Sequence, residues 1–510
     1  MKSINTSISR ISILCAVMFL FVLSSCKKDR NENMPDQSVT GPDLAIYALT
    51  NNNILLSLNA KNVSSITKQT TITGLQTGET ILGIDFRPAT GTLYGVGSTS
   101  RVYIINQETG IARAVSTTAF TPAISGTAIG LDFNPTVDRI RLVTSAGQNL
   151  RLNPENGAVA ATDGALNGAT NPNVTAAAYT MNKAGATTTV LFVIDVTNDK
   201  LYKQDPPNDG KLVEVGSIGF DVEQAGDFDI GPDGTVALAP LKVAGKTNLY
   251  SINLTTGKAT KIANEFANTI IGIAIPTEAV AYAVSSTNEL VIFNPLNPAP
   301  VNKPITGLLT GETIVGMDFR PINGQLYALG STSRLYTINA SSGLATVVGT
   351  APLTTLLSGT NFGFDFNPTV DRIRVVSNLG QNLRLNPNDG AVVGIDGVLS
   401  PGTPSITGAA YTNNFAGAAT TVLYDIDTQT SRLYKQDPPN MGALVDVGAL
   451  GVTATAANGF DIGSTSGTAY ALLTVGGVTK VYTINLTTGA ATAGATLTGT
   501  FKGFTLGLGL

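Results

Sequence analysis

Histidine is absent from all 510 residues of the chain. Because histidine is the side chain that changes protonation near neutral pH, its absence excludes a Ser-His-Asp triad, a histidine general base and histidine metal ligands. Tryptophan is absent as well, which argues against a sugar-binding surface built on stacked indole rings. The catalytic routes that stay open use carboxylates, Ser/Lys, tyrosine or bound calcium.

Cysteine and charge are also scarce. Cys15 and Cys26 are the only cysteines, and 13% of the residues are charged. A net charge of −4 without a basic stripe gives no attraction to phosphate, so we expect no nucleic-acid partner. No nucleophile elbow or phosphate-binding loop stands in a strand-to-helix context. We therefore expect neither an enzyme nor a cofactor. The content of hydrophobic residues, 43%, is enough to form large buried cores.

The first 25 residues have the pattern of a targeting signal. Lys2 and Arg10 form a short basic region that precedes a 13-residue apolar run, Ile11 to Leu23. This run is too short to span a membrane. The sequence Leu23-Ser24-Ser25-Cys26 resembles the bacterial lipoprotein signal, in which cleavage leaves a lipidated cysteine at the new N-terminus. We predict a signal peptide over 1–25 and a lipid on Cys26. An ordinary secretory signal with an incidental cysteine is the alternative.

Residues 26–43 are polar, contain two prolines and are predicted to form a flexible tether. Lys27 follows the lipid site, where a lipoprotein retained in an inner membrane of the enterobacterial type often has aspartate. We therefore expect lipid anchoring in the outer membrane, on either its periplasmic or its exterior face. Cys15 leaves with the signal, so the mature chain can form no intrachain disulfide.

Most of the chain is one unit written twice. Residues 130–159 recur at 363–392 with 23 of 30 positions identical, and TGETILGIDFRP at 77–88 returns as TGETIVGMDFRP at 310–321. The duplication predicts two domains, 44–276 and 279–510, joined by a short connection.

Within each copy, strand-like segments alternate with Asn/Gly turns such as SINLTTGKATKI, a rhythm typical of propeller blades. Each copy accommodates five blades, and each ends in a spare strand, at 269–276 and at 501–510. If that strand completes the first blade of its own copy, the all-β chain forms two five-bladed rings. One ten-bladed ring and another all-β arrangement are the alternatives.

The phrases FNPTVDRIR, GQNLRLNP and YKQDPP resemble a bacterial family known as domain of unknown function 4394, across both copies. The resemblance implies a propeller-like β fold and placement in the envelope or outside the cell. It implies no activity, substrate or catalytic residues.

Several carboxylates are candidate ligands. Asp227, Asp229 and Asp233 share one loop and could bind calcium, although the spacing differs from DxDxDG and a plain hairpin is the alternative. Six aspartates occupy apolar leading strands, where they must be hydrogen-bonded or paired. We expect them to bond the amides of the following turn, with ligand contacts in a central channel as the alternative. They are Asp85, Asp132, Asp229, Asp318, Asp365 and Asp461.

The third blade of each copy concentrates arginine. Strand alternation places Arg141 opposite Arg151, which is unfavourable unless anions lie between them. Either these side chains bind Asp132, Asp138 or a carboxylate of the adjacent blade, or they bind an anionic ligand such as an acidic sugar or a peptide terminus. The candidate binding residues are Arg139, Arg141, Arg151, Arg372, Arg374 and Arg384.

These features together predict a lipid-anchored, non-catalytic envelope protein whose propellers bind or scaffold a protein or glycan. The alternatives are a carboxylate- or calcium-dependent hydrolase or lyase acting on polysaccharide or lactone, and a purely structural envelope component.

Overall fold

The computed structural model describes residues 39–510, which form an all-β protein. The predicted signal peptide, Cys26 and most of the tether lie outside the described residues. The helical elements within 39–510 are two 3₁₀ turns, η1 (Pro207–Asp209) and η2 (Pro439–Met441). No helix in this range combines the length and apolar character needed to cross a membrane.

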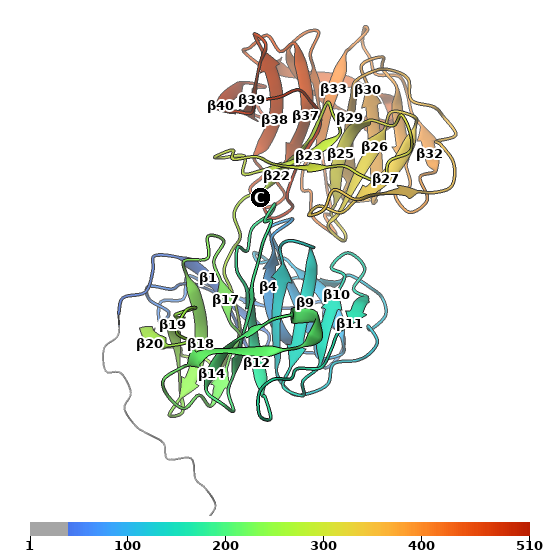
Figure 1. Cartoon of the computed structure of the whole chain (residues 1–510). Helices are drawn as coiled ribbons and strands as arrows, with labels where there is room; N and C mark the ends of the chain where they lie inside the picture. The colour runs from blue at the N-terminus through green and yellow to red at the C-terminus, as the bar shows by residue number, and fades with distance from the viewer. Residues whose placement is uncertain (1–38) are drawn as a thin grey trace, which may run out of the picture.

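Five antiparallel sheets form the first ring of blades (Figure 1). Four of them have four strands, and in the fifth the short strands β16 and β17 both pair with β18. The strands are β1 (Ala45–Thr50), β2 (Ile54–Asn59), β3 (Lys68–Thr71), β4 (Ile81–Arg87), β5 (Thr92–Gly97), β6 (Arg101–Ile105), β7 (Ala112–Ala114), β8 (Ile129–Asn134), β9 (Arg139–Thr144), β10 (Asn149–Leu152), β11 (Val159–Thr162), β12 (Val174–Tyr179), β13 (Leu191–Asp195), β14 (Lys200–Gln204), β15 (Leu212–Ser217), β16 (Gln224–Ala225), β17 (Asp229–Ile230), β18 (Ala237–Val243), β19 (Lys246–Ile252), β20 (Ala259–Glu265) and β21 (Ile270–Ala274).

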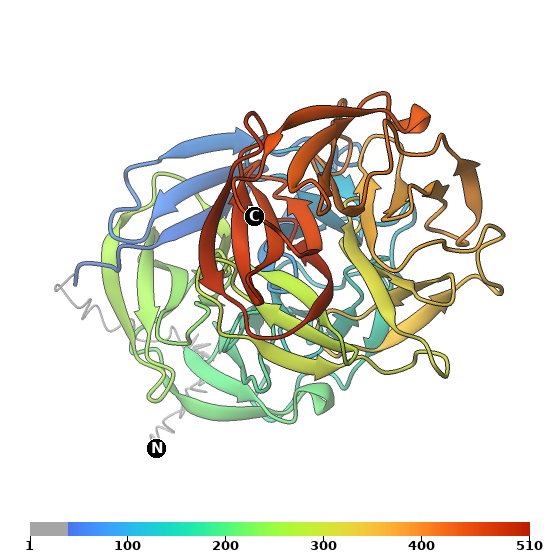
Figure 2. The same ribbon diagram turned by 90° about the horizontal axis from the view of Figure 1, so that it is seen from above.

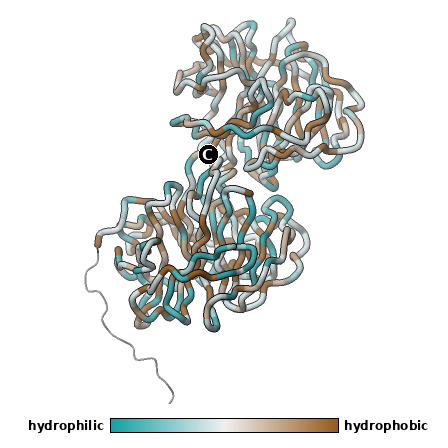
Figure 3. The backbone as a smooth tube through the Cα atoms, viewed as in Figure 1, coloured by the Kyte–Doolittle hydropathy of each residue, from teal (hydrophilic) through white to brown (hydrophobic). Residues whose placement is uncertain are grey.

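The second ring repeats this arrangement with five four-stranded sheets. Its strands are β22 (Ala281–Ser285), β23 (Glu289–Phe293), β24 (Val301–Pro304), β25 (Ile314–Arg320), β26 (Gln325–Gly330), β27 (Arg334–Ile338), β28 (Ala345–Val348), β29 (Phe362–Asn367), β30 (Arg372–Ser377), β31 (Asn382–Leu385), β32 (Val392–Ile395), β33 (Ile406–Tyr411), β34 (Leu423–Asp427), β35 (Arg432–Gln436), β36 (Leu444–Ala449), β37 (Ala456–Ile462), β38 (Ala469–Val475), β39 (Val478–Ile484), β40 (Ala491–Thr496) and β41 (Phe501–Leu506). Hydrophobic and hydrophilic segments are distributed over both rings (Figure 3), and inner strands such as β12 and β33 are buried along their whole length.

The last strand of each half completes the first blade of the same half. β21 pairs with β1, with Ala48 opposite Ile273, and β41 pairs with β22, with Ala283 opposite Phe504. No sheet within 39–510 combines strands from the two halves. The prediction of two five-bladed rings is therefore confirmed, and the alternative of one ten-bladed ring is wrong. Closure also pairs the edge that an open ring would expose.

The innermost strands of neighbouring blades contact one another around each axis. Most of these innermost strands have a glycine at the point where they come closest to the strand of the next blade. A Cβ at Gly130 of β8 would lie 2.6 Å from the backbone nitrogen of Ala177, so a side chain here would push the blades apart. The corresponding glycines of the second ring leave a cavity of only about 10 Å³ on its axis. The second ring is therefore nearly closed along its centre.

The hydrophobic core lies between adjacent blades. In four inner strands a Gly-x-Asp-Phe sequence places the phenylalanine against a tyrosine of a neighbouring blade. Tyr94 and Phe133 form one such edge-to-face pair, with ring centroids 5.2 Å apart. Such pairs contribute about 0.5–1.5 kcal/mol beyond their burial. The others are Tyr47–Phe86, Tyr282–Phe319 and Tyr327–Phe366.

The two rings are stacked, as the views from the side and from above both show (Figures 1 and 2). The turn after β4 enters the contact between them. Arg87, fully buried, forms ion pairs with Asp138 and Glu155 of its own ring and donates from Nη1 to the carbonyl of Gly324 in the other ring, at 2.9 Å. The Tyr282 hydroxyl of the second ring donates to the carbonyl of Ala89 at 2.8 Å. Buried polar contacts therefore fix one ring against the other.

Candidate functional site

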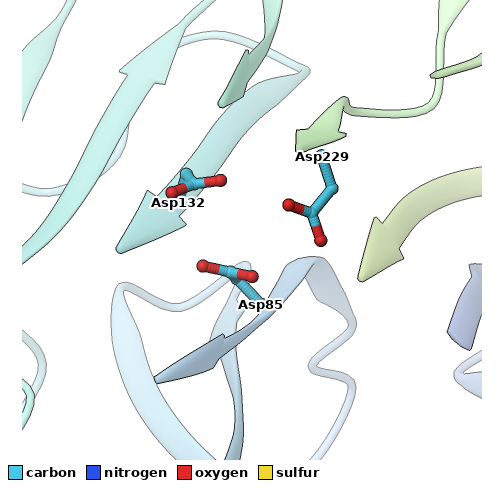
Figure 4. Close-up of side chains that lie close together, drawn as sticks. All are labelled: Asp85, Asp132 and Asp229. Carbon is cyan, nitrogen blue, oxygen red and sulfur yellow. The ribbon is translucent and has the colours of Figure 1, made fainter. Parts of the chain in front are cut away.

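Three aspartates converge on the axis of each ring. In the first ring Asp85 of β4, Asp132 of β8 and Asp229 of β17 point toward one another (Figure 4). Each offers a carboxylate oxygen, and these oxygens all lie within 4.8 Å of one another. The side chains meet because ring closure brings the same position of three inner strands to one point. Each of the three residues is at most 1% exposed.

Two members of this trio are held by backbone amides. Asp85 accepts from Phe86 at 2.7 Å and from Phe133, in the next blade, at 2.8 Å. Asp229 accepts from Ile230 and from Ile275, which follows the closing strand β21. The bonds that were expected to the following turn do not form. Each of these two aspartates instead bonds the next residue of its own strand and one amide of the neighbouring blade.

Asp132 differs from the other two. Neither of its carboxylate oxygens has a hydrogen-bond partner within the described residues, although the residue is completely buried. The amide of Tyr179 approaches Asp132 and acts to lower its pKa, but it does not reach hydrogen-bond geometry. A buried carboxylate without a partner is costly unless a proton or a cation neutralises it.

The second ring repeats the trio with Asp318, Asp365 and Asp461. Asp365 accepts from the amide of Tyr411 at 3.0 Å through one oxygen, and its other oxygen has no partner among the described residues. One feature is new: the hydroxyl of Thr505 on the closing strand lies 2.8 Å from Asp318 and 3.0 Å from Asp461.

The trios differ most in what lies beside them. In the first ring Asp227 occupies the glycine position of the axis at φ 68°, where the second ring has Gly459. Asp227 accepts amides from Leu131 and Ala177, so it bridges two inner strands.

Burial raises the pKa of all six trio carboxyls, and neighbouring carboxylates raise several of them further. For Asp132 burial is the largest cause, followed by the charges of Asp85 and Asp229. Burial raises the pKa of Asp229 to about 7 and that of Asp461 to about 6, against the lowering effect of their amide hydrogen bonds. Full ionisation of a trio is therefore unfavourable unless a positive charge joins it, because its carboxyls lie close together in a place that water barely reaches.

The sequence-predicted calcium loop does not form one cluster. Asp229 belongs to the axial trio and Asp227 lies beside it, whereas Asp233 is exposed and bonds the amide and hydroxyl of Thr235. These three carboxylates do not gather within residues 39–510. The turn separates them because Asp233 follows β17 into the hairpin that leads to β18.

The predicted arginine cluster is present, and it binds the protein's own groups. Arg141 of β9 lies opposite Arg151 of β10. One carboxylate, Asp163, lies between them: it accepts from Arg141 Nη1 at 2.6 Å and from Nε and Nη2 of Arg151 at 2.8 Å each. Arg141, 1% exposed, also donates to Tyr179 and Asn208. The anion that relieves the arginine repulsion is therefore internal.

Asp163 was not among the partners that the sequence suggested. Asp132 lies at the axis, and Asp138 pairs with Arg87 instead, so both suggested pairings are wrong. Burial opposes ionisation of Asp163, but the hydrogen bonds from Arg151 and Arg141 outweigh it and lower its pKa. The second ring holds Arg374 and Arg384 on Asp396 in the same way.

The outermost arginines of the cluster, Arg139 and Arg372, are half-buried. Each donates from Nη1 to the carbonyl of the preceding residue, Asp138 and Asp371. Each of these two contacts uses the Nη1 atom and leaves the other nitrogens of the guanidinium out of the bond.

A pocket of about 310 Å³ lies between the rings. The first ring contributes Ile111 and Arg113 of the blade β4–β7, and the second contributes Asn414 and Phe415 from the loop between β33 and β34. Arg113 packs directly on Gly417, where a Cβ would lie 1.8 Å from its Nη2. Asn414 is 2% exposed, and its Oδ1 has no partner within the described chain.

Comparison with known proteins identifies a family. The family model described as "Domain of unknown function (DUF4394)" matches residues 54–274 and again 289–505. The chain belongs to this family. No curated protein matches it. Among solved structures, the extracellular domain of BT4673 from B. thetaiotaomicron is similar at 13% identity and a TM-score of 0.25, covering 88% of this chain. The match spans 58% of the BT4673 chain.

Each DUF4394 unit carries one complete axial trio and one arginine–carboxylate cluster. Sequence reasoning found the trio aspartates singly, and the Gly-x-Asp sequence shared by five inner strands is the signal that could have placed them on one axis. It missed Asp163, Asp396 and the pocket residues Arg113, Asn414 and Phe415. No local pattern marks these residues, because each gains its role from a neighbour distant in sequence.

Proposed function

We propose that this DUF4394 protein is a lipid-anchored, non-catalytic protein of the bacterial outer membrane that binds a protein or glycan of the envelope. The lipoprotein-like signal ending at Cys26 and the polar tether support the anchoring. The paired rings provide a rigid surface at the end of that tether.

The pocket between the rings is the observation that carries the binding role. It combines apolar surface, such as Ile111 at 48% and Phe415 at 38% exposure, with polar groups available for recognition. Ligand sites in proteins are typically concave and mostly apolar with a few polar groups that orient the ligand. The guanidinium of Arg113 suits a carboxylate or another anionic group on the bound polymer.

The axial acids support the absence of catalysis. A carboxylate-dependent hydrolase must bring its acids into contact with a polysaccharide or lactone. The six trio aspartates are at most 1% exposed, so no polymer chain can reach them directly.

A binding assay tests the proposal. The full chain is purified in detergent, and its binding to isolated envelope polysaccharide and to immobilised envelope protein is measured. The double variant Arg113→Ala, Phe415→Ala should lose at least about tenfold in affinity, since centrally placed arginine and aromatic side chains each typically contribute more than 1 kcal/mol. Arg432→Ala is the matched control, because its ion pair with Asp446 lies on an exposed outer surface. Equal binding by all three proteins, or release of soluble sugar fragments by the wild type, would contradict the proposal.

A further inference from the structure

The axial trios have the donor set of a hard-cation site. Carboxylate oxygens are the preferred ligands of calcium and magnesium. The trio oxygens lie within 4.8 Å of one another, and a calcium shell with bonds of about 2.3–2.6 Å has a diameter of about 4.6–5.2 Å. One ion on the axis can therefore contact all three side chains of a ring after small movements.

An independent observation points to an ion at this place. Asp132 is 0% exposed, is directed at Asp85 and Asp229 (Figure 4), and has two oxygens without hydrogen-bond partners among residues 39–510. Its counterpart Asp365 likewise leaves one buried oxygen without a partner. Backbone amides hold the other acids of each trio. A ligand on the axis would satisfy the oxygens that the protein leaves unsatisfied.

The surrounding charges favour a cation over an anion or a neutral ligand. Besides burial, the charges of Asp85, Asp229 and Asp227 raise the pKa of Asp132, and what lowers it is the backbone amide of Tyr179 and not a cationic side chain. In the arginine cluster, by contrast, Asp163 is neutralised by two guanidiniums. Within residues 39–510, arginines thus pair with buried acids elsewhere, and no ion pair reaches a trio aspartate.

We propose that each axial aspartate trio binds one divalent metal cation, with calcium as the best fit, giving two ions per chain. The ion links three inner strands of a ring at the point where the closing strand arrives. It occupies the axis and not the pocket between the rings, so it is independent of the binding function proposed above.

The narrow axis sets how the experiment must be done. Because the centre of the second ring holds a cavity of only about 10 Å³, a bound ion exchanges slowly and an ion-free ring takes one up slowly. The full chain is therefore unfolded in denaturant with a chelator, refolded with calcium, with magnesium or with chelator alone, and separated from free metal. Metal content per chain and thermal unfolding are then measured.

We expect two ions retained per chain and a rise in Tm of roughly 5–10 °C over the chelator sample. Asp132→Asn should retain one ion, and the double variant Asp132→Asn, Asp365→Asn should retain none. Asp233→Asn, at an exposed position of the hairpin outside the trio, is the control and should keep two. Wild-type protein that refolds without retaining calcium or magnesium, and whose Tm neither metal raises, overturns the proposal and leaves the trios neutralised by shared protons. This wild-type readout decides the question even if a variant fails to fold.

Discussion

At the scale of single residues, the structure distinguishes buried charges that have a partner from those that do not. Arg141 contacts Asp163, Asn149, Asn208 and Tyr179. Asp425 of β34, fully buried as well, has no hydrogen-bond partner for either oxygen within the described residues. Removing the first side chain and removing the second should therefore have opposite effects on stability.

Arg141→Ala should destabilise the first ring by roughly 3–5 kcal/mol, because it removes the buried one of the two guanidiniums that neutralise Asp163 and takes the donor away from the side-chain oxygens of Asn149 and Asn208. Unfolding in urea measures this loss. Arg432→Ala, which removes an ion pair that is 36% and 50% exposed, is the control and should cost at most about 1 kcal/mol. An unchanged stability of Arg141→Ala together with lost binding to envelope material would instead make the arginine face the binding site.

Asp425→Val should stabilise the second ring increasingly as the pH rises. Burial raises the pKa of Asp425 to about 8, against the lowering effect of Arg374. A carboxyl whose folded pKa lies above its unfolded value of about 3.9 weakens the folded state progressively between these two pH values. Valine occupies the equivalent position 193 of the first ring, between Ala177 and Tyr202, just as Asp425 lies between Ala409 and Tyr434.

The difference in Tm between Asp425→Val and wild type should therefore be small at pH 4 and grow up to pH 8. A constant difference across this range would show that Asp425 is ionised in the folded protein throughout. Asp446→Ala, at the exposed ion pair with Arg432, serves as the surface control.

At the scale of secondary structure, the closing strands decide whether each ring is complete. β21 and β41 supply the innermost strand of the first blade of their rings. Without such a strand, β1 or β22 would present unpaired backbone groups and an apolar edge. Each strand also brings a group to the axis, since Ile275 donates to Asp229 and Leu506 donates to Asp461.

A fragment of residues 40–276 should fold as a soluble monomer, whereas the same fragment ending at residue 266 should aggregate or form pairs, because only the first contains β21. Sedimentation and thermal melting of the two fragments check this. If both fragments aggregate, the second ring is needed to stabilise the first through the contacts of Arg87 and Tyr282.

At the scale of the whole molecule, two rings of the same design are stacked through buried polar contacts and are preceded by the predicted anchor. The repeats diverge where they face each other. Arg87 is completely buried with its side chain in the contact, while its counterpart Arg320 forms the equivalent pair with Asp371 at 11% exposure. Duplication therefore supplied the framework, and the asymmetric contact produced the pocket that neither ring has alone.

Cys26→Ser should abolish lipid attachment and leave the protein with an uncleaved signal or release it as a soluble form. Membrane fractionation combined with mass spectrometry of the N-terminal peptide measures the outcome. Cys15→Ser is the control and should remain lipidated, since Cys15 lies within the predicted signal peptide. A lipid found on Cys26→Ser protein would show that the anchor lies elsewhere.

The sequence by itself determined the number of copies, the order of strands and turns, and the residues that must be buried. Repeats such as Gly-x-Asp-Phe and the Asn/Gly turns are local, and local patterns are sufficient to place strands and hairpins. Alternation along β9 and β10 was likewise enough to set Arg141 opposite Arg151.

Only the tertiary structure decided which strand closes which ring, and with it the axial site. The pairing of Ala48 with Ile273 joins residues at opposite ends of the first repeat, and the ten-bladed alternative used the same local strands. Asp85, Asp132 and Asp229 meet because five inner strands surround one axis. Asp163 replaces the expected partners of the arginines because it directly follows β11, which pairs with β10 and so brings the carboxylate beside both guanidiniums. Such contacts depend on side chains from distant segments arriving at one point, and no spacing along the chain encodes that distance.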